Sequence, residues 1–496
     1  MIQVTFAGIL LLVSFSSAVR ANGPADSLRR PLFQTVDLVA GETSRVAVVR
    51  GSVVRVRLLS VDVTTDPLRS AVRSARVRVE IEGKTVTLGS GNYELPRTAG
   101  SVQVDCPVVS AYLKNTNEDH WGLQKTVRLR FWPEGSPWIE PETFVYPVRQ
   151  RWFAGLTQIG NEPSYVDGGE EPKRKSIYYH AGLDIGGAEG LTEIVAATDG
   201  LVVSRGMQWM PEHAPKKTPV QPRYDVVYVL DDRGWYYRYS HMQTIDPAMQ
   251  PGARVKKGQK LGLLGKEGGS GGWSHQHFEI KSRQPSGKWG TQEGYAFLWQ
   301  AALQDSNAAV IAVARPHHFA RVGDRVVLDG GKSWCREGKP ARFDWTFTDG
   351  STGSGPRVER SYDRPGTYSE ILRVTDSRGH FDYDFAAVQI IDPAHPEDLP
   401  PTIHAAFAPT TGLHAGDPVT FKVRTFRTTD GSETWDFGDG SPLVTVHSDG
   451  NVNQHAPDGY AVTVHRFARR GDYLVRVERA NRRGWKATAR LHVRVD

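Results

Sequence analysis

The chain has 496 residues, of which 39% are hydrophobic and 10% aromatic, with 50 glycines and 30 prolines. This composition excludes a disordered chain and, because the glycines follow no triplet repeat, a collagen-like one. At roughly 100–200 residues per domain, the length predicts about three to five domains. The formal net charge is only +6, from 61 Lys and Arg against 55 Asp and Glu, and the basic residues are scattered. We therefore expect no nucleic-acid partner.

Two cysteines in the whole chain exclude a disulfide framework and any multi-cysteine zinc or iron–sulfur site. Cys106 and Cys335 lie far apart in the sequence and fall in different predicted domains. We therefore expect two buried thiols and no bridge between them.

The N-terminal segment has the pattern of a secretory signal peptide. Residues 4–18, VTFAGILLLVSFSSA, are apolar but too short to span a bilayer comfortably, and residues 19–21, VRA, offer a cleavage site. We expect residues 1–21 to be removed, although no Lys or Arg precedes the apolar stretch; the alternative is an uncleaved anchor. No later stretch has the ~18 uninterrupted apolar residues of a membrane helix. The sequence thus predicts an exported protein, periplasmic, cell-surface or secreted, without an integral membrane span after cleavage.

Apolar and polar residues alternate with period two between residues 23 and 150. Typical runs are VVRVRL at 53–58 and ARVRVEI at 75–81, separated by turn residues. Because successive side chains of a strand point to opposite faces, this pattern predicts an antiparallel N-terminal β-sandwich. Its exposed faces would carry Arg, and we find no residue pattern with an evident chemistry in it.

A second β-rich block follows at residues 151–306, with turn signals about every ten residues. The one helix expected in it covers residues 295–303. The connection from the N-terminal domain, residues 149–152, is short and has no flexible spacer.

The C-terminal part contains a tandem repeat. The first copy has WTFTDG at 345–350 and PGTY at 365–368, and the second has WDFGDG at 435–440 and RGDY at 470–473. Each copy is about 90–100 residues of short predicted strands, and this size and strand content are typical of immunoglobulin-like sandwiches. The W-x-F-x-D-G turn and the G-x-Y strand resemble PKD domains, and this resemblance implies spacer or ligand-presenting modules without catalysis.

A Pro-rich linker separates the two copies, so we expect domains at 307–392 and 402–496. The predicted fold class is all-β: an N-terminal sandwich, a β-rich block and two immunoglobulin-like sandwiches.

Three short elements of the middle block carry histidines. They are HAGLD with His180 and Asp184, YSHM with His241, and SHQHFE with His275 and His277. In a strand, His275 and His277 point to the same face, which suits a divalent metal. A catalytic zinc uses about three protein ligands and a water molecule, with a base to accept a proton from that water. Three ligands and two bases account for all five residues.

The segments between these elements complete a pattern. ATDG at 197–200 precedes the second element, and GARVKKGQKLG at 252–262 precedes the third. In this order the elements resemble the lysostaphin/LytM-type zinc metalloendopeptidases, over about residues 178–299. Two departures are Gln276, where the family usually has Leu, and the long stretch 207–223, which either walls the groove or is an inert insertion.

The resemblance implies a role for each residue. His180, Asp184 and His277 would ligate Zn²⁺, and His275 would be the general base. His241 would hydrogen-bond the developing oxyanion or the nucleophile.

The resemblance also implies a substrate, the peptide stems or cross-bridges of bacterial peptidoglycan. Two alternatives stay open: a catalytically silent scaffold or activator of wall hydrolases, and a cell-surface adhesive or carbohydrate-binding protein. Glu279, on the same strand face as His277, is a candidate for orienting a ligand. We also hypothesise that the N-terminal domain partly covers the active-site groove, so that deletion of residues 23–150 would raise activity.

Overall fold

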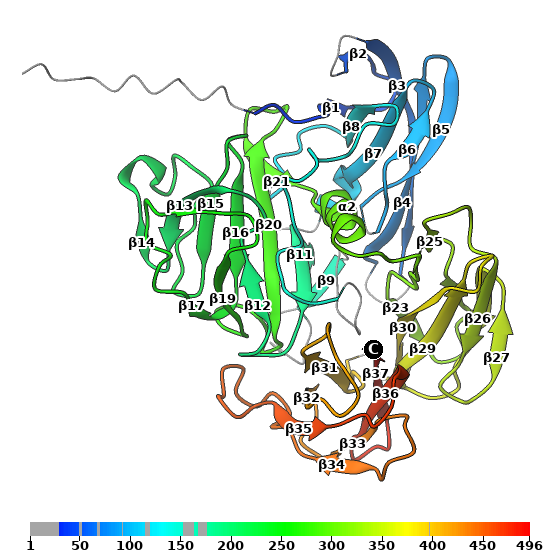
Figure 1. Ribbon diagram of the computed structural model, residues 1–496. Helices are drawn as coiled ribbons and strands as arrows, with labels where there is room; N and C mark the ends of the chain where they lie inside the picture. Colours follow the sequence, from blue (N-terminus) through cyan, green and yellow to red (C-terminus); the bar gives the residue numbers. More distant parts are fainter. Residues whose placement is uncertain are drawn as a thin grey trace, which may run out of the picture.

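The computed structural model describes residues 29–48, 52–66, 70–91, 93–114, 120–151, 163–166, 176–395 and 397–496. The predicted signal peptide and Trp152 of the predicted connection lie outside these residues. The described part is nearly all β (Figure 1), which confirms the predicted fold class. Its helices are α1 (Ser110–Leu113), the 3₁₀ helix η1 (Pro211–His213) and α2 (Tyr295–Asp305). None of these described helices is long and apolar enough to cross a membrane.

The N-terminal domain is a sandwich of two four-stranded antiparallel sheets. Its strands are β1 (Gln34–Leu38), β2 (Thr43–Ala47), β3 (Val53–Thr65), β4 (Val72–Ile81), β5 (Lys84–Gly89), β6 (Arg97–Ala99), β7 (Val102–Val109) and β8 (Val127–Pro133). The sheets have the orders β1-β8-β7-β6 and β2-β3-β4-β5. The period-two runs place Val54, Val56 and Leu58 of β3 inside the core and the intervening Arg residues outside.

The middle domain, described at residues 163–166 and 176–306, contains the histidine-bearing elements. Its strands are β9 (Pro163–Val166), β10 (Ser176–Tyr179), β11 (Leu183–Gly186), β12 (Glu193–Val195), β13 (Gly200–Arg205), β14 (Gln208–Trp209), β15 (Val227–Leu230), β16 (Tyr236–Ser240), β17 (Met242–Ile245), β18 (Arg254–Val255), β19 (Lys260–Leu264), β20 (His275–Arg283) and β21 (Trp289–Gln292). The main sheet has the order β11-β20-β16-β15-β13-β14, and a second sheet has the order β12-β19-β17.

Helix α2 covers the predicted helix and ends two residues later, at Asp305. It packs into a core that the N-terminal and middle domains share: the Phe33 and Phe297 rings stack with centroids 6.0 Å apart, and Phe144 lies against Phe278. Backbone hydrogen bonds also join residues 145–149 to β12 and the residues that follow it. Since a shared core cannot be divided without exposing apolar surface, these two domains form one folding unit.

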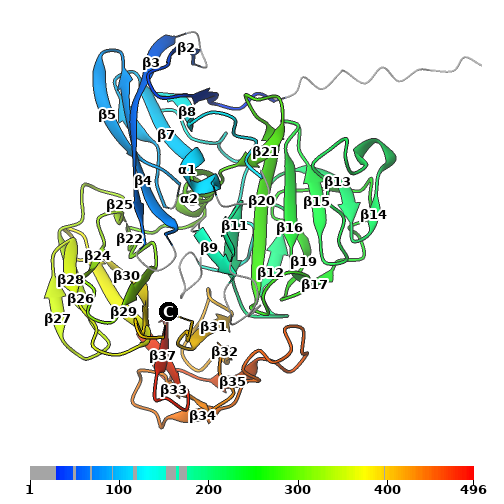
Figure 2. The ribbon, with the colours of Figure 1, turned by 180° about the vertical axis from the view of Figure 1, so that it is seen from behind.

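The C-terminal part holds two sandwiches: the first repeat domain (307–392), at the right of Figure 1 and the left of Figure 2, and the second repeat domain (402–496), at the bottom of both. The strands of the first are β22 (Val310–Ile311), β23 (His318–Arg321), β24 (Val326–Asp329), β25 (Trp334–Cys335), β26 (Arg342–Thr346), β27 (Thr352–Ser354), β28 (Arg357–Arg360), β29 (Gly366–Thr375) and β30 (Phe381–Ile391). Those of the second are β31 (Thr402–Ala408), β32 (Val419–Phe426), β33 (Glu433–Asp436), β34 (Val444–Val446), β35 (Ala461–His465), β36 (Gly471–Ala480) and β37 (Lys486–Val495).

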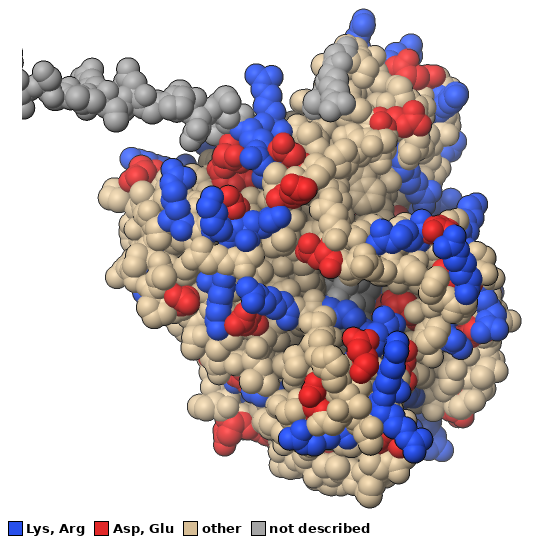
Figure 3. Space-filling model, in the orientation of Figure 1, with Lys and Arg blue, Asp and Glu red and all other residues tan. Residues whose placement is uncertain are grey.

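The repeated tryptophans, Trp345 and Trp435, are each buried in the core of their own sandwich. A parallel pairing of β29 with β37 joins the two repeat domains into one nine-stranded sheet. Cys106 and Cys335 are free and buried, as predicted. On the face shown in Figure 3, Lys and Arg are interspersed with Asp and Glu, in agreement with the scattered charge of the sequence.

Candidate active site

The predicted site residues come together on one face of the main sheet. In the register of β11 against β20, Asp184 lies opposite His277 and Gly186 lies opposite His275. Directly paired residues of antiparallel strands project to the same side, which places Asp184, His275 and His277 together. Gly182, between His180 and Asp184, has a φ of +93°, and a Cβ there would lie 2.9 Å from the Phe278 carbonyl oxygen. This glycine lets the turn return His180 toward Asp184.

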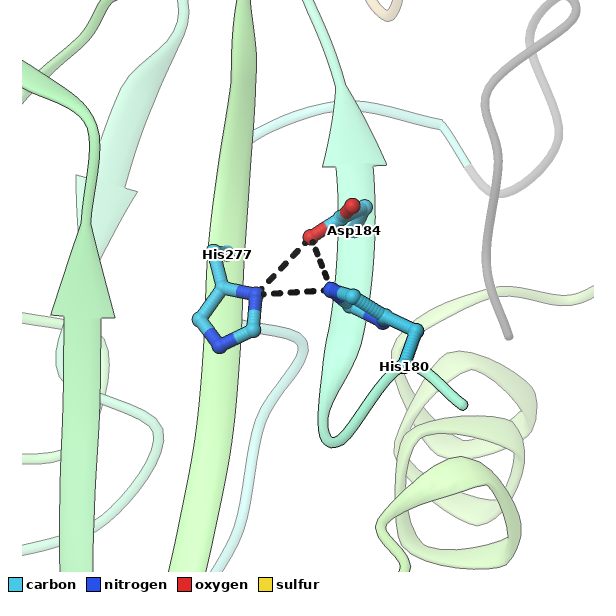
Figure 4. A group of neighbouring side chains, drawn as sticks. All are labelled: His180, Asp184 and His277. Atoms are coloured by element: carbon cyan, nitrogen blue, oxygen red, sulfur yellow. Dashed lines mark hydrogen bonds and ion pairs between the residues drawn. The ribbon is translucent and has the colours of Figure 1, made fainter. Parts of the chain in front are cut away.

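Three donor atoms converge at this face (Figure 4). His180 Nε2 lies 3.1 Å from His277 Nδ1 and 3.2 Å from Asp184 Oδ1, and His277 Nδ1 lies 2.9 Å from the same oxygen. In a tetrahedral zinc site with bonds of about 2.1 Å, neighbouring ligand atoms are about 3.4 Å apart. The separations therefore need to open by only a few tenths of an ångström to hold the ion.

The chemistry of the three donors also suits zinc, because one carboxylate and two neutral imidazoles are acceptable ligands. Burial raises the pKa of the Asp184 carboxyl, but His180 and His275 and the hydrogen bonds to Asp184 outweigh it and hold that pKa well below its ordinary range. Burial lowers the pKa of His277 to about 4. At neutral pH the cluster therefore offers a carboxylate and an uncharged imidazole.

His275 lies beside the three donors. Its Nε2 is 3.5 Å from Asp184 Oδ1, and its Nδ1 lies 3.0 Å from the Trp273 carbonyl oxygen. Since a carbonyl only accepts, Nδ1 carries the proton and Nε2 keeps the lone pair. Burial lowers the pKa of His275, which keeps the imidazole neutral. Its ring stacks on Trp273 with centroids 3.8 Å apart and planes at 13°.

His241 stands at a kink between β16 of the main sheet and β17 of the second sheet. Its φ is +64°, a left-handed conformation that residues other than glycine rarely adopt. The Asp225 carboxylate accepts the backbone N–H of His241 at 2.8 Å. The His241 ring lies 4.5 Å from that of His275, centroid to centroid, and its Nδ1 donates to the Glu267 carbonyl oxygen at 2.6 Å. Burial, with His275 and His277 nearby, holds the pKa of His241 well below its ordinary range.

Two further residues, Asp225 and Arg223, belong to the site although no sequence motif marks them. Asp225 is buried and forms an ion pair with Arg223, and Arg223 Nη2 lies 3.2 Å from His241 Nδ1. Arg223 is the last residue of the long stretch 207–223, so the end of that stretch reaches the active site. The residue types are ordinary, and only the fold brings them to His241.

The two other residues singled out from the sequence, Gln276 and Glu279, are both buried. Gln276 packs inward, and its side-chain amide donates to the His277 carbonyl oxygen at 2.7 Å. The Glu279 carboxylate accepts from Thr291 and pairs with Lys281, each at 2.7 Å. Burial alone would raise the pKa of Glu279, but Lys281 and other neighbours, His277 among them, lower it to about 2. The Glu279 carboxylate thus bonds to Thr291 and Lys281, and neither of these contacts orients the His277 ring.

The N-terminal domain reaches the site through Tyr179, which directly precedes His180. The Tyr179 ring stacks on Tyr112 with centroids 3.9 Å apart and is buried in the core of the N-terminal sandwich. That the N-terminal domain partly covers the active-site groove stays a prediction. Deletion of residues 23–150 is not a clean test of it, because it removes the partners of Tyr179 and every side chain that the N-terminal domain contributes to the shared core.

Comparisons with known proteins fit this layout. A family model described as Peptidase family M23 matches residues 178–288, and PKD domain models match residues 307–390 and 404–495. Among solved structures, Helicobacter pylori Csd3 in its orthorhombic crystal is 15% identical, with 55% of this chain and 81% of that one covered and a TM-score of 0.20. The Clostridium thermocellum CbhA fibronectin(III)-like modules are 12% identical, with 38% and 94% covered and a TM-score of 0.15. The chain therefore carries a peptidase family M23 domain, of the LytM type, followed by two PKD domains.

Proposed function

We propose that the protein is an exported zinc metalloendopeptidase that hydrolyses peptide bonds in the stems or cross-bridges of bacterial peptidoglycan. The observation that carries the proposal is the convergence of His180, Asp184 and His277 in a domain of a peptidase family. Two lone pairs and a carboxylate oxygen directed at one point repel each other unless a cation or a proton lies between them.

A zinc ion held there would polarise the scissile carbonyl and lower the pKa of a water molecule to about 7. His275 Nε2 accepts the proton of the attacking water and donates it to the leaving amine, because Nδ1 is already engaged with the Trp273 carbonyl.

The tautomer of His241 selects between its two predicted roles. Of the two contacts at Nδ1, the one to the Glu267 carbonyl oxygen is the shorter, at 2.6 Å against 3.2 Å to Arg223 Nη2, and it places the proton on Nδ1. In the neutral ring Nε2 can then only accept a hydrogen bond. An acceptor can hold the nucleophilic water but cannot donate to an oxyanion. We therefore assign His241 to the nucleophile, where it and His275 each accept a hydrogen bond from the same water.

A surface recess of about 410 Å³ lies next to His241 and offers room for a substrate. Met242 and Gln243, which follow His241, line it together with Tyr224 and Glu267. The Tyr224 side chain is exposed and its hydroxyl donates to the Glu267 carboxylate at 3.0 Å.

Two parts of the proposal rest on the sequence. Export is supported by the signal-peptide pattern of residues 1–21. The choice of peptidoglycan is supported by the resemblance to lysostaphin/LytM-type enzymes.

The test is digestion of purified peptidoglycan by the mature chain, with mass analysis of the released fragments. We expect peptide-bond products, and we expect the His275→Ala variant to lose activity by about 10²–10⁴-fold. The matched control is His213→Ala, since His213 lies in the same domain but bonds to Tyr236. Cleavage of sugar bonds alone contradicts the proposal, and binding to the wall without cleavage favours the silent scaffold.

A further inference from the structure

The loop that leads into β20 is held by another domain. We define residues 265–274 as the active-site loop, since it ends directly before His275. The second repeat domain forms four hydrogen bonds with its backbone, from donor to acceptor: Ser274 N to Tyr460 Oη at 2.7 Å, Arg424 Nη1 to Gly272 O at 2.6 Å, Asn451 Nδ2 to Gly271 O at 3.1 Å and His455 Nε2 to Gly268 O at 2.9 Å.

Two of these contacts come from side chains that are buried and fixed. Arg424 is fully buried, pairs with Asp449 through two hydrogen bonds of 2.8 and 2.5 Å, and donates to the Asn453 carbonyl oxygen. The Tyr460 hydroxyl accepts the Ser274 N–H and lies 2.8 Å from His404 Nδ1. Because a buried, fully bonded network has one low-energy arrangement, it presents a rigid surface to the loop.

The contact continues to His275 through Trp273. One face of Trp273 is stacked on the His275 ring, and the Trp273 carbonyl oxygen accepts the His275 Nδ1–H. The buried His404 ring of the second repeat domain also contacts Trp273, with centroids 5.3 Å apart and planes at 64°. Figures 1 and 2 both show β31 and β32 next to the middle domain, on the side of β12. Trp273, which stacks on the His275 ring and accepts its Nδ1–H, is thus itself contacted by the second repeat domain.

We propose that the second repeat domain completes the active site, with Tyr460 and Arg424 as positioning residues that fix the active-site loop and, through Trp273, the ring of His275. This proposal rests on the peptidase function above, because it assigns a role in the same site. A PKD domain then takes part in catalysis, whereas the resemblance to PKD domains implied only spacing or ligand presentation.

The test uses the full chain with Tyr460→Phe, which removes one hydroxyl and keeps the ring. The matched control is Tyr473→Phe, because Tyr473 lies in the same domain and its hydroxyl donates to the Arg469 carbonyl oxygen at 2.7 Å, with no part in the loop contact. We expect amide hydrogen exchange at residues 268–275 to be about ten-fold faster in Tyr460→Phe and unchanged in the control. We expect kcat to fall about 10- to 100-fold with KM within about two-fold, and the zinc content to stay equal.

A milder variant covers the case in which Tyr460→Phe does not fold. His455 has an exposed side chain, so His455→Ala removes one loop contact without opening a core, and a smaller change in the same direction is expected. Unchanged exchange in the loop overturns the proposal whatever the activity. Faster exchange with unchanged kcat overturns the positioning role and leaves the peptidase function intact. An inactive parent chain contradicts the proposed function, and the exchange rates then still decide whether the second repeat domain fixes the loop.

Discussion

Asp225 anchors the kink that carries His241, and its removal is a sharp test of the site. Its carboxylate accepts the backbone N–H of His241 at 2.8 Å and pairs with Arg223. His241 holds a φ of +64°, and the chain passes there from one sheet to the other. A residue in this conformation persists only where its surroundings fix it.

Substitution of Asp225 by Ala should lower the free energy of unfolding by about 2–3 kcal/mol. A buried N–H that loses its acceptor costs about 1–3 kcal/mol. The lost ion pair adds less than a fully buried one, because the Arg223 side chain is 30% exposed and water can replace part of the contact. For a folding unit of about 280 residues, with an unfolding entropy of about 2.1 cal/mol/K per residue, each kcal/mol lowers Tm by about 2 °C, so we expect a fall of about 4–6 °C. Displacement of His241 should reduce kcat by about 10- to 100-fold.

Calorimetry and peptide hydrolysis measure the two effects on the same protein. Asp225→Asn keeps an acceptor for the His241 N–H without the charge, so its Tm and kcat should lie between those of the parent and of Asp225→Ala. Asp246→Ala is a control, because Asp246 lies in the same domain and its carboxylate bonds to the nearby Ala248 N–H. An Asp225→Ala protein with the Tm and kcat of the parent would refute the anchoring role.

Two further predictions concern other parts of the chain. Burial raises the pKa of the Cys106 thiol to about 12, so at pH 8 a thiol reagent should modify it only at the rate of unfolding; rapid labelling of the native protein would contradict this. Burial alone would raise the pKa of Asp439, but hydrogen bonds from Ser441 and His465 lower it to about 2. Because this value lies below the ordinary 3.8, the stabilisation is present above about pH 4 and is lost as the pH falls toward 2. Asp439→Asn should therefore flatten the acid dependence of Tm, and an unchanged slope would count against it.

The fold of each domain could be predicted because alternation and turn residues are local signals. The run at 53–58 lies within β3, and the helix predicted at 295–303 is α2, which extends to Asp305. The packing between domains could not be predicted in this way. Periodicity shows that Phe33 and Phe297 are apolar, but not that they lie in one core.

The candidate site, too, could be predicted only where the signal is local. The H-x-H spacing places His275 and His277 on one face of any strand, and the register of β11 with β20 brings Asp184 to them. Asp225 and Tyr460 act through contacts that depend on the tertiary fold, and Ser274 and Tyr460 are 186 positions apart in the sequence. Nothing in their own sequence surroundings distinguishes them from other polar residues.

The most direct test of the central claim is the zinc content of the purified chain, measured beside Asp184→Asn. The substitution replaces the anionic oxygen among the three converging donors by a neutral amide oxygen, a much weaker zinc ligand, and leaves His180 and His277 in place. We expect about one zinc ion per parent chain and a large loss of it in the variant, with peptide-bond hydrolysis lost in parallel. An active parent chain without zinc, or a variant that retains the full zinc content, would contradict the account.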